Sequence, residues 1–284
     1  MKVLLPLLFF ATASLAQTVN LNDLAADLTV PATEAGPPAA GKRVKATTRG
    51  WEGTEAHHTL YLPPEWKPGE KSLPVIVEYA GNGNYSNKFG DVSDGSVEGC
   101  MLGYGLSAGH GFIWVCMPFV EVDKDQKRNA RLWWGDVPET KRYCQATVKE
   151  VCQQYGGDPA RVVLMGFSRG AIACNYIGLH DDEIAKLWCG FLCHSHYDGE
   201  YKHSAADQPA WPERLGRLHG RPQFICQEMG TEKTQAVIAQ SGIKGDFTFA
   251  TLPFANHTAR WTLCDLPLRT QAREWLAKTV ASPR

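Results

Sequence analysis

Short apolar segments alternate along this chain with amphipathic or turn-rich stretches. Three of them, LPVIVEYAG, GFIWVCMPF and RVVLMGFS, are continuous apolar runs, which are typical of strands buried on both faces of a sheet. Four further segments are predicted as strands: HHTLYLPPEW, LWCGFLCHS, PQFICQ and DFTFATLPF.

Four helices are predicted between and after these strands, over residues 139–155, 170–180, 231–241 and 267–280. Alternating strands and helices predict an α/β fold with a mostly parallel central sheet and helices on both faces. The longer irregular stretches are expected to form the rim of a pocket. These stretches are residues 82–100, 119–138 and 197–221.

The beginning of the chain follows another pattern. Lys2 precedes an apolar run over residues 3–10, and small residues follow up to Ala16. This arrangement predicts a signal peptide over residues 1–16, so a secreted or periplasmic protein is expected. No later apolar stretch is long enough to span a bilayer.

Residues 17–48 are rich in Ala, Pro, Thr and Gly and show little periodicity. We expect them to form a leader with a short helix at 21–28, followed by a catalytic domain over 49–284. The formal net charge of −1 gives no indication of nucleic-acid or membrane partners. Nine cysteines, an odd number, allow one or two disulfides without indicating their pairing.

The segment Gly166-Phe167-Ser168-Arg169-Gly170 matches the pattern G-x-S-x-G. In this motif a sharp turn from a strand into a helix exposes a nucleophilic serine. Ser168 has the required context, with RVVLM before it and AIACNYIGL after it. A second match around Ser107 has the reverse context, so it is interpreted as a helix-to-strand loop.

A serine nucleophile needs a base, and in this order of elements the base lies on a loop after the last strand. His257 meets that requirement, since it follows DFTFATLPF. The acid should follow PQFICQ, where Glu228 ends the strand and Glu232 comes four residues later. Glu232 is narrowly favoured because it lies in the loop, and Asp198 is a third candidate.

An oxyanion hole needs two backbone N–H donors. One is expected from Arg169, and the other from Gly81 or Asn82 in the loop after VIVEYAG. The Arg169 guanidinium has two equally weighted interpretations: it contacts a substrate carboxylate or the oxyanion, or it pairs with an acidic loop residue.

Two weaker signals remain. His194, His196 and Asp198 lie on one side of a strand end, where a metal site is an alternative to a rim beside the serine. Trp133 and Trp134 are candidate substrate-binding aromatics, with a loop anchor as the alternative.

TLYLPPEW, VIVEYAGNG, GFSRG and the late NHT loop resemble the secreted esterase branch of the α/β-hydrolases over about residues 51–280. That branch includes polyhydroxybutyrate-depolymerase-like, feruloyl and acetyl-xylan esterases. The resemblance implies Ser168 as nucleophile, His257 as base, and Arg169 with Gly81 or Asn82 at the oxyanion hole. The chain departs from the branch after PQFICQ, where G-x-x-D is missing, and this leaves the acid open.

We therefore expect a secreted serine carboxylester hydrolase that needs no cofactor or metal and acts on esters of polysaccharides or related polymers. The alternatives are a serine peptidase of the same fold, a non-catalytic carbohydrate-binding relative that uses Trp133 and Trp134, and a metal-dependent hydrolase at His194 and His196.

Overall fold

The computed structural model describes residues 19–70, 72–200 and 210–281. Across these ranges a nine-stranded sheet has the order β1-β2-β3-β7-β4-β10-β11-β12-β13. Strand β3 runs antiparallel to both of its neighbours, and the other pairs are parallel. The strands of this sheet are β1 (Thr33–Glu34), β2 (Arg43–Ala46), β3 (His58–Tyr61), β4 (Leu73–Tyr79), β7 (Ile113–Met117), β10 (Gly157–Phe167), β11 (Gly190–His194), β12 (Gln223–Glu228) and β13 (Phe247–Leu252).

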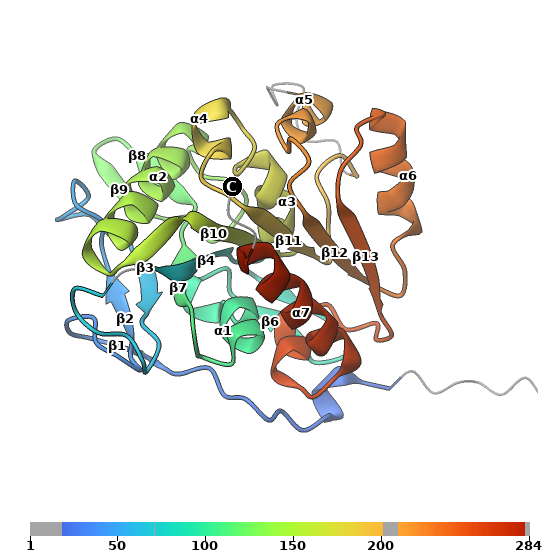
Figure 1. The fold of residues 1–284 in the computed structure, drawn as a ribbon, viewed down its shortest axis with the longest axis horizontal. Helices are drawn as coiled ribbons and strands as arrows, with labels where there is room; N and C mark the ends of the chain where they lie inside the picture. The colour runs from blue at the N-terminus through green and yellow to red at the C-terminus, as the bar shows by residue number, and fades with distance from the viewer. Residues whose placement is uncertain (1–18, 71, 201–209, 282–284) are drawn as a thin grey trace, which may run out of the picture.

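Helices cover both faces of this sheet (Figure 1). Helices α2 to α6 lie above the sheet in that view, and α1 and α7 lie below it. The helices are α1 (Leu102–Ser107), α2 (Val137–Gln154), α3 (Arg169–Tyr176), α4 (Asp182–Ala185), α5 (Trp211–Gly216), α6 (Glu232–Ser241) and α7 (Pro267–Ala281), with short 3-10 helices η1 (Leu21–Asp23), η2 (Val97–Gly99) and η3 (Ala259–Leu263).

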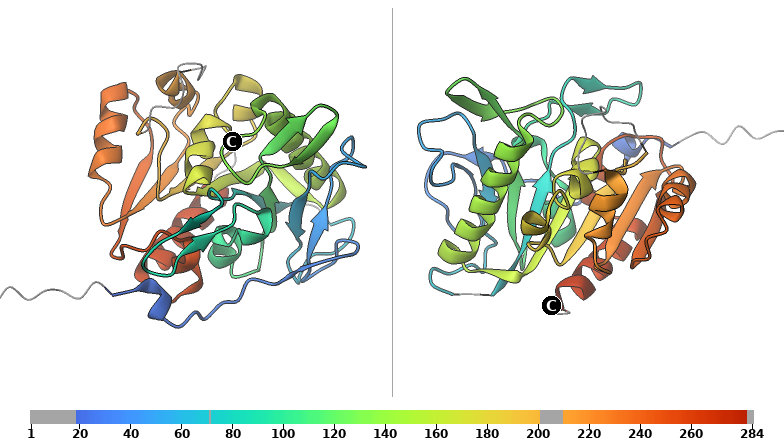
Figure 2. Two further views of the ribbon diagram at one scale, coloured as in Figure 1. Left: turned by 180° about the vertical axis from the view of Figure 1, so that it is seen from behind. Right: turned by 90° about the horizontal axis from the view of Figure 1, so that it is seen from above.

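Two small hairpins project from this core. One pairs β5 (Tyr85–Ser86) with β6 (Val92–Ser93), and the other pairs β8 (Val120–Asp123) with β9 (Gln126–Asn129). In the right-hand view of Figure 2, both hairpins project along the upper edge of the molecule. They lie in segments that the sequence analysis described as irregular, because each strand is too short to give a periodic pattern.

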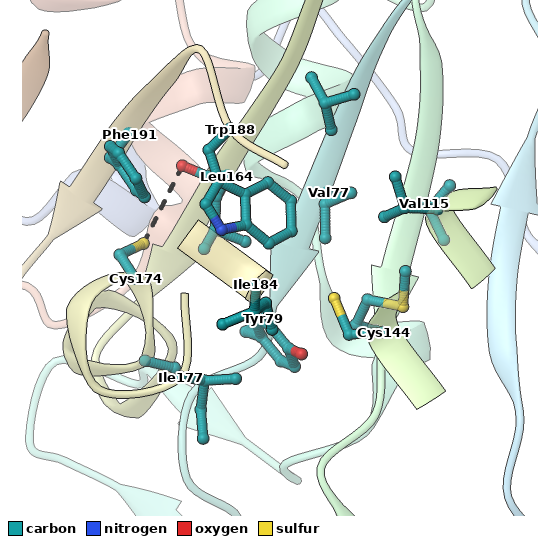
Figure 3. Packing of buried hydrophobic residues seen from close by; sticks show 14 of the residues in the cluster. Val77, Tyr79, Val115, Cys144, Leu164, Cys174, Ile177, Ile184, Trp188 and Phe191 are labelled. Atoms are coloured by element: carbon teal, nitrogen blue, oxygen red, sulfur yellow. Dashed lines mark hydrogen bonds between the residues drawn. The ribbon is translucent and has the colours of Figure 1, made fainter. Parts of the chain in front are cut away.

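Side chains along the central strands alternate between the two helical layers. On β4, Val77 belongs to the cluster that packs against α2 and α3, whereas Ile76 belongs to the cluster that packs against α1 and α7. Figure 3 shows the first cluster, with Trp188 and Phe191 near Cys174 of α3. Because the central strands are buried on both faces of the sheet, their sequences are continuous apolar runs.

The seven predicted strands and four predicted helices are all present, with small shifts at their ends. The expectation of a mostly parallel sheet with helices on both faces is therefore confirmed.

The leader assignment for residues 17–48 is wrong for the part that the structure describes. Strand β2 pairs with β3 in the main sheet, and β1 pairs with β2. Only Leu21–Asp23 is helical, as a 3-10 turn, instead of the expected helix at 21–28. Strand β2 depends on pairing with β3, and β1 depends on pairing with β2, since the composition of this segment gives little periodicity.

The predicted signal peptide over residues 1–16 lies outside the described residues. Within the described ranges, no helix has the length and apolar character needed to cross a membrane. All nine cysteines lie in those ranges, eight of them are buried, and no disulfide joins them.

Candidate active site

The candidate site lies where the parallel strands end. Phe167 at the end of β10 is in register with His194 at the end of β11, and His194 is in register with Cys226 of β12. Glu228, the last residue of β12, is in register with Leu252 of β13. Because parallel strands share their carboxyl edge, residues that follow these ends converge on one site.

Ser168 occupies the turn between β10 and α3 with φ 54° and ψ −116°, a strained conformation for a residue with a side chain. Its N–H donates to the carbonyl of His194 at 2.9 Å. A Cβ on Gly166 would lie 2.0 Å from the carbonyl oxygen of Gly170, and one on Gly170 would lie 1.9 Å from that of Tyr79. Both glycines of the motif are therefore required sterically.

Ser168, His257 and Glu228 form a hydrogen-bonded series. Ser168 Oγ lies 2.9 Å from His257 Nε2, and His257 Nδ1 lies 3.1 Å from Glu228 Oε1. The His257 ring packs against Tyr85 and Phe167, with centroids 4.9 and 4.8 Å away. The loop that carries His257 is also held by Asp91, which accepts a hydrogen bond from the His257 N–H at 2.8 Å.

The carboxylate that accepts from His257 Nδ1 belongs to Glu228, which corrects the narrow preference for Glu232. Glu232 is the first residue of α6, beyond the turn that follows β12. The third candidate, Asp198, is buried and pairs with Arg214 through two contacts of 2.7 and 2.8 Å. Of the three carboxylates, the structure brings only Glu228 to the histidine.

The environment of Glu228 favours its charged form. Burial raises its pKa, but hydrogen bonds from His257 and Ser195 together with the nearby His194 outweigh burial and hold the pKa at about 2. The carboxylate is therefore ionised at neutral pH and can stabilise a positive charge on His257.

Two residues after β11 join the site, and sequence analysis assigned neither to the acid–base series. Ser195 Oγ donates to Glu228 and also lies 2.7 Å from His257 Nδ1. His196 Nδ1 lies 3.2 Å from Ser168 Oγ. The sequence pattern at His194 and His196 predicts either a metal site or a pocket rim beside the serine, and the contact of His196 with Ser168 agrees with the rim.

The geometry does not favour a metal at His194 and His196. His194 is buried, and its ring nitrogens lie 3.3 and 3.0 Å from the carbonyl oxygens of Cys226 and Thr258. Both ring nitrogens thus face backbone carbonyl groups of the protein, to one of which the neutral ring donates, while Asp198 pairs with Arg214.

The loop after β4 lies directly against the serine. A Cβ on Gly81 would be 3.0 Å from the Phe167 ring and 3.4 Å from Ser168 Cβ, so only glycine allows this approach without displacing a neighbour. The adjacent Asn82 accepts a hydrogen bond from the Trp133 N–H through Oδ1 at 2.7 Å. Arg169 begins α3, which brings its backbone beside the same loop.

The predicted roles of the Arg169 guanidinium, in contact with the substrate or paired with an acidic loop residue, are both wrong, because its acceptors are backbone carbonyl groups. The side chain is buried and donates to carbonyl oxygens of two loops, at 2.9 Å to Gly81 and 2.7 Å to Trp133, with longer contacts to Gly95 and Ala130. Burial lowers its pKa to about 9. The guanidinium therefore ties together the loops around the serine, and its burial leaves little of it open to a substrate.

The two tryptophans have different surroundings. Trp134 packs against Tyr176 and Phe119, with ring centroids 4.6 and 5.7 Å away, so it anchors the loop. This contradicts its assignment as a substrate-binding residue. Trp133 is 56% exposed and remains a candidate contact for a substrate.

Neither a protein-family model nor a curated protein sequence matches this chain. Solved structures do match it, at low identity. A fungal esterase from Rhizomucor miehei superposes with a TM-score of 0.57 at 14% identity, over 86% of each chain. An S-formylglutathione hydrolase from Agrobacterium tumefaciens gives 0.54 at 14% identity, over 86% of this chain and 98% of that one.

A dipeptidyl peptidase 4 from Porphyromonas gingivalis gives a TM-score of 0.52 at 15% identity, over 84% of this chain and 36% of that one. Likeness at such identities bears on the fold alone. Together with the mostly parallel sheet and its two helical layers, these matches show that the chain has the α/β-hydrolase fold.

Proposed function

We propose that this protein is a serine hydrolase of carboxylic esters. The observation that carries the proposal is the series Ser168 Oγ, His257 Nε2, His257 Nδ1 and Glu228 Oε1, with contacts of 2.9 and 3.1 Å. Nucleophile, base and orienting acid follow each other in hydrogen-bond reach, as acyl transfer requires. The structural likeness to esterases supports the reaction class by analogy of fold.

In the first half-reaction Ser168 gives its proton to His257 Nε2, and Oγ attacks the ester carbonyl. The backbone N–H groups of Arg169 and of Gly81 or Asn82 stabilise the oxyanion. Glu228 stabilises the imidazolium that forms. His257 then protonates the departing alkoxide, and in the second half-reaction it activates the water that releases the acid.

Labelling with a fluorophosphonate, measured by intact mass, tests the mechanism. The folded wild-type protein is expected to gain one adduct, and Ser168→Ala and His257→Ala are expected to lose it. Ser107→Ala is the matched control, because Ser107 lies in the second G-x-S-x-G segment at the end of α1. A wild-type protein that takes up no label, or labelling that survives Ser168→Ala, would contradict the proposal.

Comparing esters with peptides tests the substrate class. We expect turnover of short acyl esters and little turnover of aminoacyl or dipeptidyl amides, because the proposed substrate is an ester. Preferred cleavage of peptides would favour a serine peptidase instead. Binding of glycans without any turnover would favour the carbohydrate-binding alternative.

We further propose that the alcohol part of the substrate is a polysaccharide or a related polymer. Trp133 supports this, since its backbone N–H is bonded to Asn82 and its exposed aromatic ring offers a surface on which a sugar ring stacks. Trp133→Ala is expected to raise KM for a sugar-linked ester and to leave KM for a small aryl acetate unchanged. Leu132→Ala, at the exposed neighbouring position, is the control.

Export is part of the same proposal. It rests on Lys2, the apolar run over 3–10 and the small residues up to Ala16. Protein recovered from the medium or the periplasm is expected to begin at Gln17. Recovery of full-length protein in the cytoplasm alone would contradict export without affecting the catalytic proposal.

A further inference from the structure

Ser168 is contacted by a second imidazole besides that of His257. His196 Nδ1 lies 3.2 Å from Ser168 Oγ, and His257 Nε2 lies 2.9 Å from the same atom. The two rings are neighbours, with centroids 5.1 Å apart and planes at 59°. A serine, one base and one acid suffice for the mechanism above, so the contact from His196 has no role in it.

The backbone at the end of β11 is what brings His196 to this position. Ser195 has φ 86°, in the left-handed region that is costly for residues other than glycine, and its N–H donates to the carbonyl of Cys226 at 2.8 Å. This turn directs the Ser195 hydroxyl to Glu228 and His257. The next residue, His196, then faces the nucleophile from another side.

The hydrogen-bond chemistry of Ser168 determines which way the His196 contact points. A hydroxyl carries one proton and two lone pairs, and a neutral imidazole carries one N–H and one lone pair. If Ser168 gives its proton to His257 Nε2, its Oγ can only accept from His196. The tautomer with the proton on Nδ1 is therefore the one that is compatible with catalysis by His257.

The surroundings of His196 support a neutral ring. Burial, reinforced by the neighbouring His257, lowers the pKa of His196 to about 4. At neutral pH the ring is then a hydrogen-bond donor without a charge of its own. It does not compete electrostatically with the imidazolium that forms on His257.

We propose that His196 is a further catalytic residue, which donates its Nδ1–H to Ser168 Oγ while that oxygen gains and loses its bond to the acyl group. The inference rests on the proposed function. In acylation the Oγ proton moves to His257, the Oγ–carbon bond forms, and the ester C–O bond breaks with return of the proton to the alkoxide. In deacylation a water proton moves to His257 while the water oxygen bonds to the acyl carbon. The Oγ–carbon bond then breaks, the acid leaves, and His257 returns the proton to Oγ.

Negative charge develops on Oγ early in acylation and late in deacylation, and a fixed donor stabilises it in both steps. His196 keeps its proton throughout, so no additional acid or base is needed. This role differs from that of the oxyanion hole, whose donors act on the carbonyl oxygen of the substrate.

Three variants at one position test the inference. His196→Leu removes the donor, and His196→Asn keeps an amide nitrogen near the place of Nδ1. His196→Gln keeps a polar side chain but shifts its amide toward the place of Nε2. The exposed His110→Leu is the control for loss of a histidine elsewhere. The measurements are the second-order rate constant of fluorophosphonate labelling, kcat for a short ester and the thermal unfolding midpoint.

We expect His196→Leu to lower the labelling rate and kcat by about 10- to 100-fold, the effect of one hydrogen bond to a developing charge. His196→Asn should recover most of that loss, and His196→Gln should recover little of it. The Gln variant provides the same comparison if the Leu variant does not fold.

Two results would overturn the role of His196 and leave the serine mechanism intact. In the first, His196→Leu, or the Gln variant in its place, reacts as fast as the wild type. In the second, His196→Asn is as slow as His196→Gln at an unchanged unfolding midpoint, which would mean that the ring only fills space. A wild-type protein that takes up no label would instead contradict the proposed function, and with it this inference.

Discussion

At the scale of single residues, the site depends on which groups reach His257. Glu228 and Glu232 are both glutamates near the end of β12, four positions apart, and only Glu228 contacts the histidine. Ser195 also reaches this pair, because its hydroxyl donates to Glu228 and lies beside His257 Nδ1. Small differences in position thus separate a residue of the site from an ordinary surface residue.

Glu228→Gln is expected to lower kcat by about 10²- to 10⁴-fold, because the neutral amide no longer stabilises the imidazolium or fixes its tautomer. Steady-state kinetics on a short ester measures the effect. Glu232→Gln is the matched control and should behave as the wild type. The assignment of Glu228 would be wrong if the two variants exchanged these behaviours.

At the scale of elements, loops that are far apart in the sequence are joined by one buried side chain. Arg169 belongs to α3, and its guanidinium donates to carbonyl groups after β4 and after β9. A planar guanidinium can donate to several acceptors at fixed angles, and the ammonium group of a lysine on its flexible stem cannot. The loop that supplies Gly81 and Asn82 is therefore held in place by the residue next to the nucleophile.

We expect Arg169→Lys to lower kcat by at least about tenfold and to lower the unfolding midpoint, since buried carbonyl groups lose their donors. Activity assays and thermal melts of the same preparations check both effects. Arg131→Lys is the control, because Arg131 is exposed and its ion pair with Asp94 lies at the surface. If both variants behaved alike, the bracing role of Arg169 would be refuted.

At the scale of the whole molecule, the first and last parts of the chain support each other. Leu21 is fully buried, and its N–H donates to the side chain of Asn256 at 2.8 Å. Asn256 also donates to Asp91 at 2.9 Å, and Asp91 accepts from the N–H of His257. The segment expected to be a leader is thus part of the support for the histidine loop.

Leu21→Ala should destabilise the protein by about 2–5 kcal/mol, the usual effect of truncating a buried leucine. Denaturant unfolding gives the free energy. Leu132→Ala, at a position that is 48% exposed, should change it little. An equally small effect of Leu21→Ala would mean that the packing of Leu21 does not contribute to the stability of the fold.

Acid stability is a second property of the whole fold. His58 is buried against Tyr143, and burial lowers its pKa from 6.5 to about 3. The unfolded chain takes up a proton below about pH 6.5, while the folded protein does so only near pH 3. The free energy of unfolding therefore falls as the pH decreases through this window.

His58→Asn removes this titration, so between pH 6 and pH 4 the slope of unfolding free energy against pH should decrease by up to about 1.4 kcal/mol per pH unit. Denaturant unfolding at several pH values measures it. The exposed His110→Asn should leave the slope unchanged. An unaltered slope in His58→Asn would mean that His58 does not titrate differently in the folded and unfolded states.

The sequence by itself determined seven strands of the main sheet, the four longer helices and the turn at Ser168, because apolar runs, helix ends and the two glycines of the motif are local signals. It also placed His257 after the last strand. Tertiary structure decided which carboxylate meets His257, since that depends on where β12 ends relative to its neighbour. It also decided that β1 and β2 join the sheet, that Arg169 faces the loops, and that Ser195 and His196 reach the site. These contacts join residues far apart in the chain through strand register and backbone turns, for which the sequence carries no local pattern.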